Sequence, residues 1–65
     1  MTELENLLGK QKELSQLVGF KIELVDEHGI ITTMGIMVLM AVANDLATQM
    51  ITMAHNIIKR SQKGD

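Results

Sequence analysis

At 65 residues, the chain has room for one domain (residues 1–65) with a thin hydrophobic core. It contains no cysteine, which excludes disulfides and thiolate metal sites. Hydrophobic residues make up 46% of the sequence, too many for a disordered tail. A core of this size usually needs added stabilisation, so we expect a homo-oligomer, most simply a dimer.

The charge distribution does not favour nucleic acid as a partner. The formal net charge is −2 and the basic residues are scattered, apart from a short group at positions 59–63 that can complement a helix dipole. Phe20 is the single aromatic residue, so there is no platform for base stacking. Residues 1–8 carry two acids and no basic segment, which is unlike a secretory signal and predicts a cytoplasmic protein.

A helix is predicted at about residues 3–18. Thr2 and Glu5 have the spacing of a capping box, and Gly19 is placed to end the helix. Leucines recur at spacings of three and four and form one apolar stripe. The N-terminal segment is therefore expected to be an amphipathic helix.

The pattern changes to a period of two from Phe20, which predicts a strand or short β-hairpin at about residues 20–33. In the hairpin reading, residues 26–29 form the turn and residues 30–33 the second strand. The alternative is a single strand followed by a loop. The turn holds Asp26, Glu27 and His28, which we interpret as a solvated acidic turn; cation binding is the other interpretation.

The last segment predicts a long helix at about residues 35–60, followed by a short polar tail at 61–65. Its apolar side has heptad-like spacing and is interpreted as the oligomer interface: Ile36, Leu39, Ala43, Leu46, Met50, Met53 and Ile57. A helix of this length, about 38 Å, is too long for the first helix, about 24 Å, to cover. The expected fold is mainly α with a small β element, assembled as a helical homo-oligomer.

A polar stripe follows the other side of the same predicted helix, formed by Asp45, Thr48, Thr52, His55 and Lys59. It is either a solvated face or an inter-subunit polar or ligand site. This polar side also weighs against a membrane span. The uncharged run at residues 29–44 is 16 residues long, shorter than the roughly 18 apolar residues that a span needs.

No catalytic, metal-binding or cofactor-binding residues can be assigned. His28 and His55 lack the spacing of a metal site, and Ser15 and Ser61 lack a neighbouring histidine that could activate them. There is no glycine-rich phosphate loop. The sequence therefore predicts a protein that is not an enzyme and needs no cofactor.

Five of the six methionines lie between positions 34 and 53. Unbranched thioether side chains adapt to irregular contacts, so these residues are interpreted as core or dimer-interface filler. A plastic groove for a partner helix is the alternative.

The strand at residues 20–25, the Thr-containing run with Met34-Gly35, and the helix that follows resemble the second half of serine-recombinase (resolvase/invertase) catalytic domains. The resemblance covers about residues 4–60 and implies an oligomerising helix. The half of that family that carries the nucleophilic serine and its arginines has no counterpart here, so the resemblance transfers no catalytic residue.

The predicted function is that of a small, non-catalytic interaction or regulatory protein that acts as a homo-oligomer. Such a profile is typical of an accessory factor of a phage or mobile element that inhibits or modulates a partner protein. One alternative is a small-ligand or nucleotide-binding sponge with pockets between subunits. The other is a DNA-recombination accessory factor related to the serine-recombinase helix.

Overall fold

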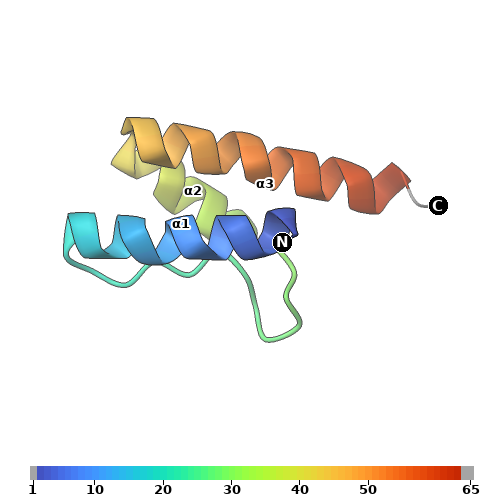
Figure 1. The fold of residues 1–65 in the computed structure, drawn as a ribbon, viewed down its shortest axis with the longest axis horizontal. Helices are drawn as coiled ribbons and strands as arrows, with labels where there is room; N and C mark the ends of the chain where they lie inside the picture. The colour runs from blue at the N-terminus through green and yellow to red at the C-terminus, as the bar shows by residue number, and fades with distance from the viewer. Residues whose placement is uncertain (1, 64–65) are drawn as a thin grey trace.

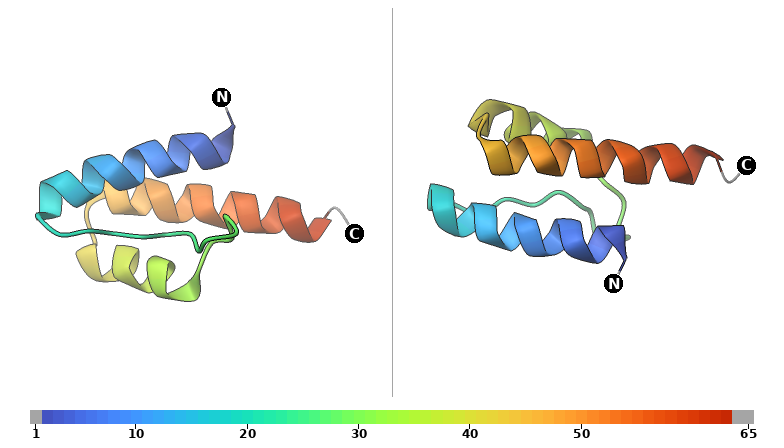
Figure 2. Two further views of the ribbon diagram at one scale, coloured as in Figure 1. Left: turned by 90° about the horizontal axis from the view of Figure 1, so that it is seen from below. Right: turned by 45° about the horizontal axis from the view of Figure 1, so that its top comes forward.

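The computed structural model describes residues 2–63, with side chains described through Ser61, and contains three helices. Helix α1 spans Glu3–Val18, α2 spans Thr33–Val42 and α3 spans Asp45–Lys63. Helices α1 and α3 run side by side in opposite directions, and α2 packs on α3 at one end (Figures 1 and 2). The prediction of a mainly α fold is confirmed.

The start and end of α1 agree with the sequence-based prediction. Thr2 and Glu5 form both hydrogen bonds of a capping box, and Gly19 ends the helix in the left-handed conformation, with φ of 80°. The Thr2 backbone and hydroxyl donate to the Glu5 carboxylate at 2.9 and 3.0 Å. These bonds favour the charged form and lower the pKa of Glu5 below its ordinary value.

The predicted long helix at 35–60 is wrong, because the chain folds back at Ala43 and Asn44. Ala43 takes a left-handed conformation (φ 54°) at the end of α2. The Asn44 side chain then accepts a hydrogen bond from the Ala47 backbone at 2.7 Å, which caps the start of α3. The reversal brings Leu39 of α2 and Met50 of α3 into one core, where both are fully buried.

Helix boundaries also differ at both ends of the predicted long helix. Helix α2 begins at Thr33, which was expected to be in a strand, because Thr32 caps it by accepting from Gly35 N at 3.0 Å. Helix α3 continues to Lys63, so residues 61–63 are not a separate tail. Residues 64–65 of the predicted tail lie outside the described residues.

Residues 20–32 form no regular strand among the described residues, but their geometry is close to a hairpin. One antiparallel bridge joins Val25 and Ile31, and Thr32 N donates to Leu24 O at 2.9 Å. Asp26 forms the turn by accepting from His28 N and Ile30 N at 2.8 and 3.0 Å. The predicted period-two burial holds for Ile22 and Leu24, which are 2% and 1% exposed.

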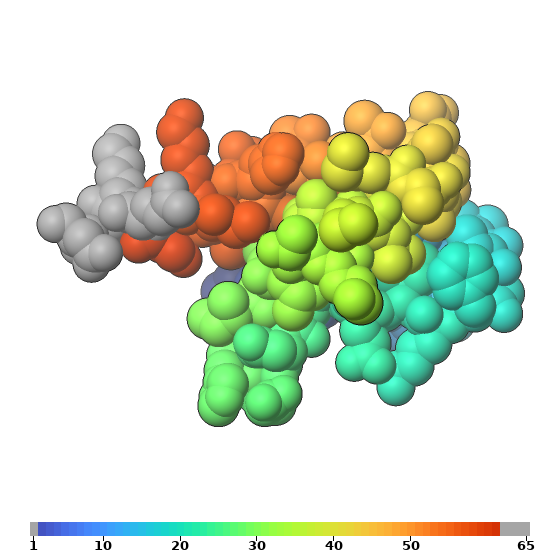
Figure 3. Space-filling view, turned by 180° about the vertical axis from the view of Figure 1, so that it is seen from behind, coloured from blue at the N-terminus to red at the C-terminus, as the bar shows by residue number. Residues whose placement is uncertain are grey.

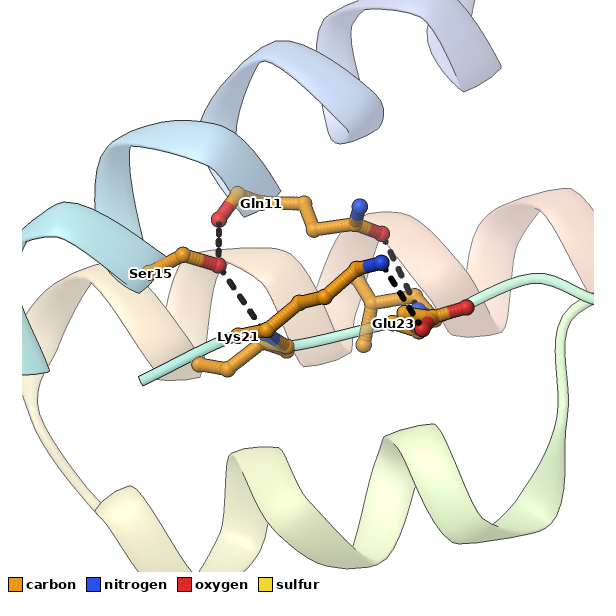
Figure 4. Close-up of polar contacts among 6 residues, drawn as sticks. Gln11, Ser15, Lys21 and Glu23 are labelled. Carbon is orange, nitrogen blue, oxygen red and sulfur yellow. Dashed lines mark hydrogen bonds and ion pairs between the residues drawn. The ribbon is translucent and has the colours of Figure 1, made fainter. Parts of the chain in front are cut away.

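The extended segment at 21–24 lies between α1 and α2, and side chains of α1 accept hydrogen bonds from two of its backbone N–H groups (Figures 2 and 4). Gln11 Oε1 accepts from Leu24 N at 3.0 Å, and Ser15 Oγ accepts from Ile22 N at 3.1 Å. The Ser15 hydroxyl donates in turn to the Gln11 carbonyl oxygen at 2.9 Å. Side chains of α1 thus replace the missing strand partner.

Candidate interaction surface

The predicted interface residues mostly pack inside a single chain. Leu39 and Met50 are completely buried, so the prediction that they lie between subunits is wrong. Four others are partly buried against the same core: Ile36, Leu46, Met53 and Ile57. Ala43, the seventh residue, is exposed at the reversal. The heptad-like periodicity indicated an apolar side of these helices. Because the chain folds back at Ala43 and Asn44, most of that side packs within a single chain.

The reversal also removes the length argument for an oligomer. Helices α1 and α3, with 16 and 19 residues, are about 24 and 28 Å long, so α1 covers most of α3. The exposed residues of α3 are polar, and its apolar residues face α1 and α2. An uncovered apolar surface must therefore be sought on another element.

That surface lies on α2. Met34, Met37 and Met40 are 75%, 62% and 63% exposed and follow each other at intervals of three residues, with Ala41 exposed beside them. We call these four residues the methionine face. Helix α2, which carries this face, lies at the front of the molecule in the space-filling view (Figure 3, yellow-green). The sequence-based interpretation of the methionines as core or dimer-interface filler did not separate these exposed side chains from the buried Met50.

An apolar groove continues the methionine face at the C-terminal end of α2. Its volume is about 470 Å³, and it is lined by Val18, Phe20, Val38, Ala41 and Val42. Phe20, the single aromatic residue of the chain, is 54% exposed at this groove. The segment after α1 and the end of α2 therefore form one connected apolar surface.

A second apolar hollow of about 250 Å³ lies at the other end of the molecule, between the turn at 29–31 and the C-terminal part of α3. Its lining includes Ile30, Ile57 and Ile58. Arg60 near the end of α3 forms an ion pair with Glu3 at the start of α1. This ion pair holds the two helix ends together. This hollow is separate from the methionine face.

The polar stripe of α3 lies on its exposed side, away from α1 and α2. All five residues are exposed: Asp45, Thr48, Thr52, His55 and Lys59. The hydroxyls of Thr48 and Thr52 donate to backbone oxygens one turn earlier on the same helix, at 3.0 and 3.3 Å. None of the five lines either hollow. Their assignment to an inter-subunit or ligand site stays a prediction.

The acidic turn has a structural explanation in Asp26, whose carboxylate organises the turn. Glu27 and His28 are exposed, and their side chains approach to 3.8 Å. Within residues 2–63, no group of three or more His, Asp or Glu side chains is arranged to hold a metal ion. No helix in this range is long and apolar enough to cross a membrane.

Comparisons with known proteins leave the function open. No protein-family model, curated protein or solved structure matches this chain. The resemblance to serine recombinases therefore stays a prediction from the sequence.

Proposed function

We propose that this chain is a non-catalytic interaction protein that assembles with copies of itself through the methionine face of α2. The observation that supports the proposal is the composition of α2, which carries no charged residue and is apolar around its whole circumference. A helix of this kind is normally buried on all sides. Here α3 and the segment at 21–24 cover only one side, where Gly35 and Leu39 are buried.

A second copy is the occupant that fits this face best. In a two-fold contact the same patch meets itself, so a charged patch would repel its copy, whereas the methionine face carries no charge. Unbranched methionine side chains can interdigitate without exact complementarity. The acidic turn beside the face, with Asp26 and Glu27, disfavours an anionic lipid surface as the occupant.

The non-catalytic part of the proposal is supported by the chemistry of the side chains. No polar or charged side chain is buried among those the structure describes, so no catalytic group is held in a desolvated environment. A role in inhibiting or modulating another protein is part of the proposal. The polar stripe of α3 would remain exposed in the assembly and available to such a protein.

The proposal is tested by placing a charge on the methionine face. Met37→Glu should convert the assembly to a monomer without unfolding it, because Met37 is exposed in the single chain and glutamate is a good helix former. Thr52→Glu puts the same charge on the exposed face of α3 and should leave the mass unchanged. An oligomeric mass retained by Met37→Glu, measured by light scattering, would contradict the proposal.

A further inference from the structure

The two ends of α2 differ in their charged surroundings because the preceding segment runs antiparallel to it. Leu24 lies against Gly35 near the start of the helix, and Phe20 lines the groove beside its end. The acidic turn with Asp26 and Glu27 is consequently found at the N-terminal end of α2. Lys21 pairs with Glu23 at 3.4 Å, and the Glu23 backbone lies against Gly35 near the start of α2, whereas Asp45 of α3 follows the C-terminal end of α2.

These charges distinguish the two ways in which α2 helices of two copies can pack about a two-fold axis. A parallel arrangement would bring the two acidic turns together, with like charges facing each other. An antiparallel arrangement separates the two acidic turns and brings each toward the end of α2 that is followed by one acid, Asp45. It also opposes the two helix dipoles favourably. The avoided repulsion between the two acidic turns and the opposed dipoles therefore favour the antiparallel packing.

The spacing of the exposed methionines locates the axis. Met34, Met37 and Met40 are evenly spaced, and Met37 lies at the middle of Thr33–Val42. An antiparallel two-fold contact centred on the methionine face therefore has Met37 at its axis. In each subunit, Met34 then lies toward the C-terminal end of α2 of the partner subunit, where the groove beside Phe20 is open.

Building on the self-assembly proposed above, we infer that a second copy docks antiparallel on α2, with the two-fold axis passing over Met37. Met37 contacts Met37 of the partner subunit, and Met34 lies opposite Met40 of the partner subunit. The groove of about 470 Å³ receives the most exposed of the methionine side chains, the partner's Met34.

Cysteine cross-linking of the full chain tests this register, because the natural sequence contains no cysteine. Met37→Cys should form a disulfide-linked dimer, twice the 7.2 kDa of one chain, on mild oxidation. Met34→Cys alone should not link. In the antiparallel register, position 34 of one subunit and position 34 of the other would be about 9 Å apart along the helices, which is beyond the reach of a disulfide. A mixture of Met34→Cys and Met40→Cys should link the two variants to each other.

The pattern of links separates failure of the register from failure of the self-assembly. If Met34→Cys, Met37→Cys and Met40→Cys each link to themselves and the mixture does not, the packing is parallel. The inferred register is then overturned while self-assembly through α2 stands. If none of the three links faster than Thr52→Cys, a control on the exposed face of α3, the methionine face is not an interface and both proposals fail.

Discussion

Gly35 of α2 lies directly against the backbone of Leu24. A Cβ atom at position 35 would be 2.8 Å from Leu24 Cα and 3.0 Å from Glu23 O. This contact sets how closely α2 approaches the extended segment. The buried side of α2 is therefore fixed by backbone packing, which leaves the methionine face pointing outward.

Replacing Gly35 tests this contact. Gly35→Ala should destabilise the fold by about 1–3 kcal/mol, because the clash is with backbone atoms that cannot move without separating α2 from the segment. Gly9→Ala is the matched control, since a Cβ at that position of α1 would meet no neighbouring element within 4 Å. The control should stabilise the chain by about 0.5–1 kcal/mol. If Gly35→Ala and Gly9→Ala change the urea midpoint of unfolding equally, the close contact between Gly35 and the Leu24 backbone is absent.

Gln11 is expected to contribute more to stability than its position on a helix surface suggests. Gln11→Ala removes the acceptor for the backbone N–H of Leu24, a buried residue, and should cost about 1–3 kcal/mol. Gln16→Ala, on the exposed side of α1, should change the free energy of unfolding by less than about 0.5 kcal/mol. Hydrogen exchange at the Leu24 amide should accelerate only in the first variant.

The reversal between α2 and α3 predicts opposite effects at two neighbouring positions. Ala43→Gly should stabilise the chain by up to about 1 kcal/mol, because glycine adopts the left-handed conformation without a Cβ penalty. Asn44→Ala should destabilise it by about 1 kcal/mol through loss of the cap on α3. A loss of stability in Ala43→Gly would instead support a continuous helix through this region. Thermal unfolding of both variants provides the measurement.

Charges at Met50 and Met37 should have different consequences. Met50 is fully buried, so Met50→Glu should unfold the chain, because an unpaired charge in the core is poorly tolerated. Met37→Glu should keep its helical circular dichroism and lose only the assembly. If Met50→Glu stays folded and merely becomes monomeric, Met50 belongs to an interface rather than to the core.

Local signals in the sequence predicted α1 well. The capping box at Thr2 and Glu5 and the glycine at position 19 depend on neighbouring residues only, and both ends of the helix agree with them. Burial of Ile22 and Leu24 also followed from their alternation with charged residues. The ladder that would make these residues a regular strand was absent, because Gln11 and Ser15 of α1 provide the hydrogen bonds instead.

The error at the long helix came from predicting it from the apolar periodicity alone. Asn44-Asp45 is a good helix start, yet the apolar spacing continues through it, and alanine rarely adopts the left-handed conformation seen at Ala43. Whether α2 and α3 continue or fold back depends on the core that the reversal creates. That core joins residues far apart in the sequence, so its tertiary contacts could not be read from local spacing.

The mass of the natural chain in solution, measured by light scattering from low micromolar to near-millimolar concentration, is the most direct test of the central claim. We expect a dimer, twice the 7.2 kDa of one chain, at the upper concentrations and dissociation on dilution. A well-folded monomer over the whole range would contradict self-assembly through the methionine face of α2.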